Sequence, residues 1–111
     1  MNCYEIWTDL QPGTNDLEFV GFVKAYLGHL EGKGLVESFR IRRRKLGFGP
    51  DGFGEWNITL EFRDLHQLDE AFGLVATRSG EIEKLHHEVY SRVRNAKFAL
   101  YRDYPDEVRG A

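Results

Sequence analysis

His86 is the side chain of this chain whose spacing best suits acid–base chemistry. At roughly 100° per helical residue it lies about 50° from the centre of the apolar stripe of its segment. An imidazole at that position reaches the space between helix and sheet, where it can give or take a proton near neutral pH. The alternative is a boundary histidine bonded to backbone or water, which the same spacing allows.

No metal-ligand or nucleophile pattern accompanies this histidine. The segment 86–88 (HHE) lacks the His-Glu-x-x-His spacing of a zinc site, and neither a serine nor Cys3 stands in a nucleophile motif. The segment 47–52 matches the glycine pattern of dinucleotide-binding loops, but such a loop must open a helix and this one opens into a strand. We therefore predict no metal site, no cofactor and no covalent intermediate.

Two arginines could hold the anionic end of a ligand whose apolar body enters the same space. Arg43 lies beyond the apolar end of its strand, near Trp56, and a cation over an indole ring suits either ligand binding or protection of the strand edge. Arg78 follows the second helical segment. The ligand-binding residues predicted for a cleft between helices and sheet are Tyr26, Arg43, Trp56, Phe72, Arg78 and His86.

The elements that must position these residues include two alternating segments, 38–45 and 55–62, joined by a glycine-rich turn. A turn centred near Pro50 and Asp51 makes the numbers of paired residues sum to about 101. The predicted pairs are Arg40 with Glu61, Arg42 with Thr59, Arg44 with Asn57, Phe39 with Phe62, and Ile41 with Leu60. One face of this hairpin is then apolar and the other is rich in arginine.

Further strands are predicted over 3–8 and 95–101. Helices are predicted over 15–31, with Asn15 as N-cap, and from Asp64 onward, with a break at 79–81. The residues of the second helix predicted to face inward are Leu65, Leu68, Phe72 and Val75. The order strand, helix, strand, strand, broken helix, strand predicts an α+β, ferredoxin-like βαββαβ fold, with the helices on one face of a four-stranded antiparallel sheet. We expect one domain over 1–111 with an irregular tail over 103–111.

Strand parity gives this sheet a second, open face on which aromatic and charged side chains mix. One interpretation is a solvated face with cross-strand ion pairs, each worth less than about 1 kcal/mol. We favour the other interpretation, in which two copies pack these faces together into a dimeric α+β barrel. The predicted interface residues are Trp7, Arg40, Arg42, Arg44, Glu61 and Tyr101.

Composition argues against several classes of partner. The chain has 111 residues, of which 41% are hydrophobic and 30% charged, and its formal net charge is −3. A negative net charge argues against nucleic acid and anionic membranes as partners. The lone Cys3 permits no internal disulfide, and no stretch has the apolar length of a membrane span or signal peptide, so we expect a cytoplasmic protein.

The whole chain resembles the dimeric α+β barrel superfamily, and within it small uncharacterised bacterial proteins. The segments that carry the resemblance are 4–10 (YEIWTDL), 25–30 (AYLGHL), 43–47 (RRKLG) and 71–76 (AFGLVA). The resemblance implies a homodimer with a helix–sheet cleft in each subunit, as in cofactor-free monooxygenases and haem-degrading relatives. The haem degraders use an Asn, Trp and His set in that cleft. Trp56 and His86 stand in suitable places, but no asparagine matches, and this departure argues against haem degradation.

These observations predict a homodimeric protein that binds an amphipathic carboxylate or an aromatic metabolite in the helix–sheet cleft. A cofactor-independent, monooxygenase-like enzyme is the catalytic form of this hypothesis. An RNA-recognition-like module has the same element order, but parity puts Asn57, Thr59 and Glu61, not aromatic residues, on the open face of the third strand. A purely structural dimer is the third hypothesis.

Overall fold

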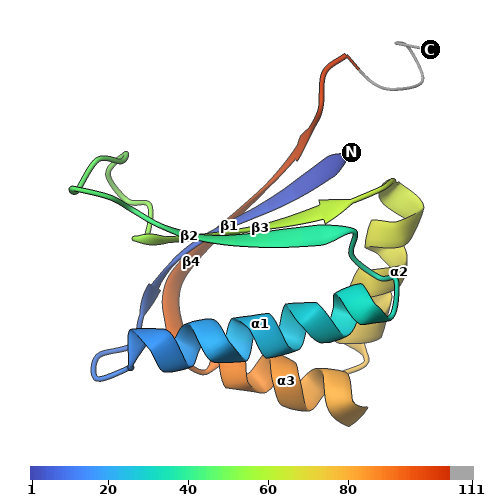
Figure 1. The fold of residues 1–111 in the computed structure, drawn as a ribbon, viewed down its shortest axis with the longest axis horizontal. Helices are drawn as coiled ribbons and strands as arrows, with labels where there is room; N and C mark the ends of the chain where they lie inside the picture. Colours follow the sequence, from blue (N-terminus) through green and yellow to red (C-terminus); the bar gives the residue numbers. More distant parts are fainter. Residues whose placement is uncertain (106–111) are drawn as a thin grey trace.

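A four-stranded antiparallel sheet, covered on one face by three helices, makes up residues 1–105, the part of the chain that the computed structural model describes (Figure 1). Along the chain the elements are β1 (Asn2–Leu10), α1 (Asp16–Gly32), β2 (Ser38–Arg43), β3 (Trp56–Phe62), α2 (Leu65–Ala76), α3 (Gly80–Tyr90) and β4 (Val93–Arg102). The strand order across the sheet is β2-β3-β1-β4. This is the predicted α+β, ferredoxin-like arrangement, with the second helical region broken into α2 and α3.

The register predicted for the β2–β3 hairpin is wrong by two residues. Phe39 pairs with Leu60, Arg40 with Thr59 and Arg42 with Asn57. The described ladder contains none of the five predicted pairs: Arg40–Glu61, Arg42–Thr59, Arg44–Asn57, Phe39–Phe62 and Ile41–Leu60. The four of these residues that lie in β2 each face a β3 residue two positions earlier, and Arg44 lies beyond the end of β2. Because the shift is an even number, every side chain keeps its predicted face.

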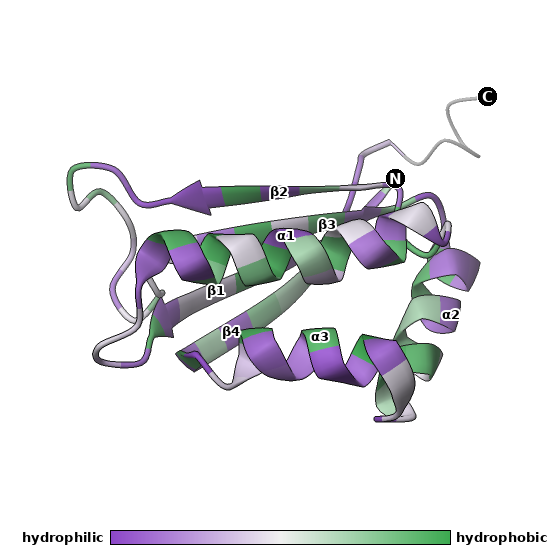
Figure 2. Cartoon of the chain, turned by 60° about the horizontal axis from the view of Figure 1, so that its bottom comes forward, coloured by the Kyte–Doolittle hydropathy of each residue, from purple (hydrophilic) through white to green (hydrophobic). Residues whose placement is uncertain are grey.

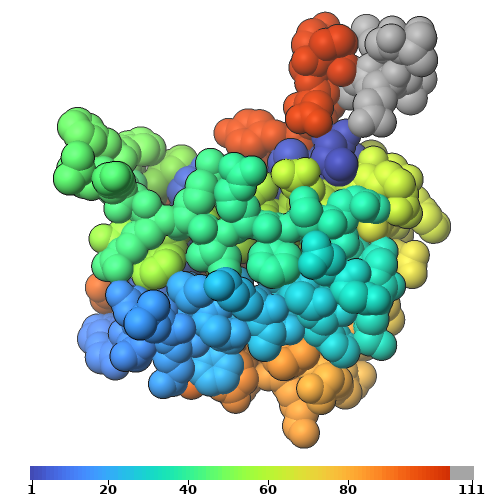
Figure 3. Space-filling view, viewed as in Figure 1, coloured from blue at the N-terminus to red at the C-terminus, as the bar shows by residue number. Residues whose placement is uncertain are grey.

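The connecting loop explains the difference in register. In place of one turn at Pro50 and Asp51, the loop makes two, closed by backbone hydrogen bonds from Phe48 N–H to Lys45 C=O (3.1 Å) and from Phe53 N–H to Pro50 C=O (3.4 Å). The loop and the end of β4 project from the side of the sheet that the helices leave open (Figure 3).

Helix α1 begins at the predicted cap and supplies a large share of the core. The Oδ1 atom of Asn15 accepts a hydrogen bond from the backbone N–H of Glu18 at 2.9 Å, which satisfies one free amide of the first turn. The four buried residues of the helix follow one stripe: Phe19, Val23, Leu27 and Leu30. They pack against the buried face of β3, and Figure 2 shows α1 lying over the sheet with apolar and polar residues alternating along it.

Helix α2 is rotated from the predicted orientation. Leu65, predicted to face inward, is 61% exposed, whereas Gln67 and Ala71 are buried. A buried glutamine is tolerated here because its polar atoms are paired: Oε1 accepts from Arg63 N–H (2.6 Å) and Nε2 donates to Gly34 C=O (2.9 Å). Asp64, where the second helix was predicted to begin, caps α2: its Oδ1 accepts a hydrogen bond from Gln67 N–H at 2.8 Å. This hydrogen bond is the main cause that lowers the pKa of the Asp64 carboxyl group.

The C-terminal tail was predicted to be irregular over 103–111. Residues 103–105 follow β4 without helix or strand, and residues 106–111 lie outside the described part of the chain. Within the described residues, no helix combines the length and apolar character needed to cross a membrane.

Candidate functional site

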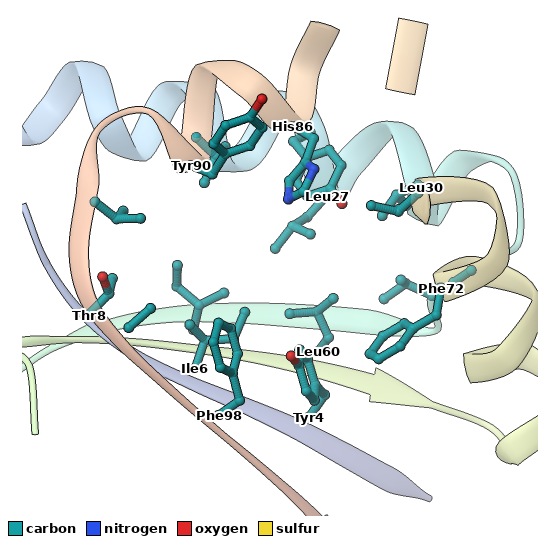
Figure 4. A pocket seen from close by; sticks show the side chains of 18 of the residues that line it. Tyr4, Ile6, Thr8, Leu27, Leu30, Leu60, Phe72, His86, Tyr90 and Phe98 are labelled. Carbon is teal, nitrogen blue, oxygen red and sulfur yellow. The ribbon is translucent and has the colours of Figure 1, made fainter. Parts of the chain in front are cut away.

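A cavity of about 400 Å³ lies between the sheet and the helices. Figure 4 shows Tyr4, Ile6 and Phe98 rising from the sheet, with His86 and Tyr90 reaching down from α3. The remaining walls are apolar side chains and one arginine: Leu27, Leu30, Val36, Ile58, Leu60, Phe62, Ala71, Phe72, Val75, Ala76, Arg78, Val89, Val93 and Ala96, with Thr8 and Tyr26. An apolar volume with a few polar groups is typical of a small-molecule site.

The polar groups of this cavity gather at one corner, formed by α1 and α3. The rings of Tyr26 and His86 stack with centroids 5.1 Å apart and an interplanar angle of 23°. Tyr90 meets His86 edge to face, with centroids 4.9 Å apart. Helical spacing creates this corner, because residues 86 and 90 are one turn apart on the same face of α3.

The carboxylate of Glu83 lies next to the His86 imidazole at this corner. The Oε1 atom of Glu83 accepts a hydrogen bond from the Tyr90 hydroxyl at 3.1 Å. Its Oε2 atom lies 3.9 Å from His86 Nδ1, beyond hydrogen-bond length, and both of these atoms are buried without a hydrogen-bond partner in the described structure. Because buried polar atoms usually have a hydrogen-bond partner, Glu83 Oε2 and His86 Nδ1 are each other's nearest candidate, and a small side-chain movement would join them.

Burial sets the protonation states of this corner. Burial is the first cause that lowers the pKa of His86 from its ordinary 6.5, while the nearby Glu83 carboxylate opposes the shift. The imidazole is therefore neutral at pH 7 and can act as a base. Burial, followed by the charge of Glu83, raises the pKa of Tyr26 to about 12, so its hydroxyl stays protonated and can donate a hydrogen bond.

Four of the six residues predicted from the sequence meet in this cavity: Tyr26, Phe72, Arg78 and His86. The other two, Arg43 and Trp56, lie outside it. The Arg43 guanidinium is 5.0 Å from the centroid of the buried Trp56 ring and pairs with Asp16 and Glu55, each at 3.0 Å. This cation therefore sits beside the first turn of α1, with both of its carboxylate partners exposed.

Glu83 and Tyr90 are site residues that sequence reasoning missed. Their spacing from His86 carries the signal, because positions three before and four after share its helical face. Phe98 of β4 was not predicted as a ligand-binding residue either, and it lines the cavity although 58% of its surface is exposed. No group of three or more His, Cys, Asp or Glu side chains within residues 1–105 is arranged to hold a metal ion.

The open face of the sheet is organised by one carboxylate. Glu5, whose side chain is 12% exposed, accepts hydrogen bonds from the Thr59 hydroxyl (2.8 Å) and from Asn57 Nδ2 (3.1 Å). Arg42 donates to Asn57 Oδ1 at 2.7 Å and lies 3.8 Å from Glu5. These contacts span β1, β2 and β3.

The other residues predicted for this face differ in how they are used. Arg44 lies in the loop, where its guanidinium donates to Phe53 C=O (2.9 Å) and Pro50 C=O (3.2 Å). Trp7 is half-buried, with its ring 4.8 Å from that of Phe53. Arg40 is exposed, Glu61 half-buried, and Tyr101 is 60% exposed.

Comparison with solved structures identifies the same fold in proteins of very different sequence. The Arabidopsis thaliana protein At3g17210 superposes with a TM-score of 0.74 at 7% identity, over 96% of this chain and 99% of that one. A dimeric ferredoxin-like protein of unknown function from Jannaschia sp. CCS1 superposes with a TM-score of 0.67 at 10% identity, over 92% and 98% of the two chains.

A third similar structure is a dimeric protein of unknown function and ferredoxin-like fold from Bacteroides fragilis NCTC 9343. Its TM-score is 0.57 at 11% identity, over 92% of this chain and 95% of that one. No curated protein matches the chain significantly. Residues 1–111 match the model of a family of unknown function, DUF6614, and the chain therefore belongs to that family.

Proposed function

We propose that this protein is a homodimer that binds an amphipathic carboxylate or an aromatic metabolite in the cavity between helices and sheet. The observation that carries the proposal is the cavity itself: about 400 Å³, walled by apolar side chains and polar at one corner. Ligand sites commonly hold about 300 Å³ or more and combine apolar walls with a few polar groups. A ligand with one ring and a short polar arm matches this volume.

Arg78 is the group that would hold the carboxylate. Among the described residues it is the only lysine or arginine lining the cavity, and it is exposed to solvent. Its guanidinium carbon lies 5.7 Å from the centroid of the Tyr90 ring, next to the polar corner. A carboxylate at Arg78 would leave the apolar body of the ligand among Tyr4, Phe72 and Phe98.

Two observations support the homodimer: the open face of the sheet, and the dimeric state of proteins that share this fold. The Jannaschia and Bacteroides fragilis proteins are described as dimeric. The face proposed to meet a second copy carries Trp7, Arg40, Arg42, Arg44, Glu61 and Tyr101. Glu5 already has three polar partners, so burying its carboxylate under a second sheet costs less desolvation free energy than burying an unpaired charge. The free thiol of Cys3, which lies on β1, is compatible with a reducing, cytoplasmic location.

Binding can be tested with phenylpyruvate and its neutral methyl ester, using isothermal titration calorimetry. We expect phenylpyruvate to bind more tightly than the ester, because only the acid can pair with Arg78. The variant Arg78→Gln should weaken binding of the acid by about 10- to 100-fold, which is the usual contribution of a charged hydrogen bond. It should leave the affinity for the ester unchanged.

The matched control is Lys84→Gln, which removes an exposed cation from α3 outside the cavity. It should leave the affinity for both compounds unchanged. Equal weakening by both variants, or no binding of either compound, would overturn the proposal. Native mass spectrometry of the purified protein adds a direct search for a co-purifying ligand, and light scattering tests for twice the mass of one chain.

A cofactor-independent, monooxygenase-like enzyme is the second candidate. The half-buried imidazole of His86, whose pKa is lowered, favours it, because a base in an apolar pocket can ionise an organic substrate that then reacts with oxygen. Oxygen uptake in the presence of a bound ligand would support this candidate, and turnover without oxygen uptake would exclude it.

A further inference from the structure

We infer that His86 is a general base that removes and returns a proton on the carbon next to a ligand carbonyl, so that the cavity supports keto–enol tautomerisation of an aryl 2-oxo acid. The inference rests on the proposed function, because the ligand must occupy the cavity.

The first support is the orientation of the imidazole. His86 extends from α3 into the cavity (Figure 4). Its Nδ1 atom is buried and faces the free Oε2 atom of Glu83 at 3.9 Å, whereas Nε2 makes no hydrogen bond to any described residue and is not buried in this way. A carboxylate beside Nδ1 favours the tautomer with the proton on that nitrogen, which leaves the Nε2 lone pair free to accept a proton from a ligand.

The second support is that Glu83 is itself held in place. The Tyr90 hydroxyl donates to its Oε1 atom at 3.1 Å, and the Tyr90 ring contacts His86 edge to face. Glu83 is therefore a positioning residue. Its negative charge stabilises the imidazolium that forms when His86 takes a proton, which is the state that the apolar walls alone would disfavour.

The third support is a hydrogen-bond donor for the charge that develops on the ligand. Tyr26 stacks on His86, lines the same cavity, and its hydroxyl has no hydrogen-bond partner among the described residues. Its raised pKa keeps it protonated. A donor beside the base suits the oxygen of an enolate, where a fixed hydrogen bond stabilises the transition state more than the ground state.

The reaction balances without a co-reactant. The Nε2 lone pair of His86 takes one C3 hydrogen of the oxo acid as a proton. The C–H bonding pair becomes the C2–C3 double bond, and the carbonyl π pair moves to the oxygen, where Tyr26 donates a hydrogen bond. The proton then leaves Nε2 for that oxygen, which gives the enol, or for C3, which restores the ketone. Nothing is oxidised or reduced.

Phenylpyruvate in D₂O is the probe, and the measured quantity is the rate at which its C3 hydrogens exchange for deuterium, followed by proton NMR. The wild-type protein should accelerate exchange above the buffer rate. His86→Gln should lower kcat/KM for exchange by about 10²- to 10⁴-fold, the usual contribution of a positioned base, with little change in calorimetric affinity. His66→Gln, which changes an exposed histidine on α2, is the matched control and should leave the rate unchanged.

Two further variants separate a chemical role from a structural one. Tyr26→Phe keeps the stacked ring and should lower the exchange rate by about 10²-fold through loss of one donor. Glu83→Gln removes the carboxylate that raises the pKa of His86, so the acidic limb of the kcat/KM profile should move to lower pH. The titratable or charged groups near the imidazole are Glu83, Arg78, His87, Tyr26 and Tyr90.

The outcomes distinguish this inference from the proposed function. Binding with exchange that depends on His86 supports both. Binding with exchange equal in the wild type and His86→Gln overturns the proton transfer and leaves the binding function standing. No binding of phenylpyruvate overturns both for this class of ligand. If His86→Gln fails to fold, as judged by circular dichroism, Tyr26→Phe and the pH limb of Glu83→Gln decide the question in its place.

Discussion

The two halves of the helix–sheet interface are built differently, although the same sheet runs through both. Under α1, four helical residues are buried, and β3 turns four buried residues toward the helices: Trp56, Ile58, Leu60 and Phe62. Under α3, no helical residue is buried, and the edge strand β4 has no buried residue. Figure 2 shows α1 passing over the middle of the sheet and α3 lying toward β4. The filled half is the part around Phe19, Val23 and Trp56, which do not line the cavity. The hollow half lies toward α3 and β4 and encloses the cavity, with Leu27 and Leu60 at the boundary between the two.

This difference shows how the chain divides its apolar residues between stability and a site. The filled half removes Phe19, Val23 and Trp56 almost fully from water, and such burial is the main source of folding free energy. The hollow half leaves side chains such as Tyr4 and Phe98 lining a space, so that part of their contact is available to a ligand.

The largest expected effect is the loss of unfolding free energy when a large side chain is removed from the filled half. Phe19 is 0% exposed and packs edge to face on Trp56 with centroids 5.5 Å apart, so Phe19→Ala should lower the free energy of unfolding by about 3–5 kcal/mol. Phe98→Ala is the matched change in the hollow half and should cost about 1 kcal/mol or less, because that ring is 58% exposed. Urea unfolding measures both, and equal losses would contradict the division.

A smaller loss is expected where the filled half buries a polar group. Gln67 is 2% exposed and joins α2 to the α1–β2 connection through Gly34 and Glu37. Gln67→Leu should lower the free energy of unfolding by about 1–3 kcal/mol, because the Arg63 N–H and the Gly34 carbonyl lose their partner. Gln11→Leu removes a comparable but exposed bond to Val93 and should cost about 0.5 kcal/mol or less. A neutral Gln67→Leu would show that water replaces these bonds.

The burial of Gln67 could not be predicted from the sequence, whereas the strands and their faces could. The alternation of polar and apolar residues predicted the strands, their faces and the order of elements, since a period of two is a local property. Burial of Gln67 depends on Gly34 and Glu37, which are about thirty residues away, so no local pattern contains it. The hairpin register was missed for a related reason: two successive turns replace the one that symmetry of the loop indicated.

The candidate site could be predicted only in part. Tyr26, Phe72 and His86 were accessible because helical spacing places them on inward or boundary faces. Glu83 and Tyr90 were equally accessible by spacing, but their importance appears only once the imidazole is seen between them. The cavity itself is a gap between facing side chains, and a sequence shows which side chains face inward but not whether they meet.

Filling the cavity should separate ligand binding from stability. Val75 lines the hollow half and is half-buried, so Val75→Phe should place a ring in the space that a ligand needs. We expect at least about tenfold weaker binding of phenylpyruvate, with a change in unfolding free energy below about 1 kcal/mol because the added atoms enter empty space rather than a packed core. Leu74→Phe, at the neighbouring exposed position, should change neither. A large loss of stability in Val75→Phe would mean that the hollow half is packed as tightly as the filled one.

The smallest effect expected is a pH dependence that belongs to the hollow half alone. Because burial lowers the pKa of folded His86 below 6.5, the unfolded chain binds more protons than the native one in the interval just below pH 6.5. Stability should therefore fall as pH drops through that interval, since native His86 resists protonation. His86→Gln should remove this part of the slope in urea unfolding curves, while His66→Gln, at a side chain 84% exposed, should leave it unchanged. The same slope in all three proteins would show that His86 is hydrated in the folded state, and the hollow half would then be a wet cleft instead of an apolar cavity.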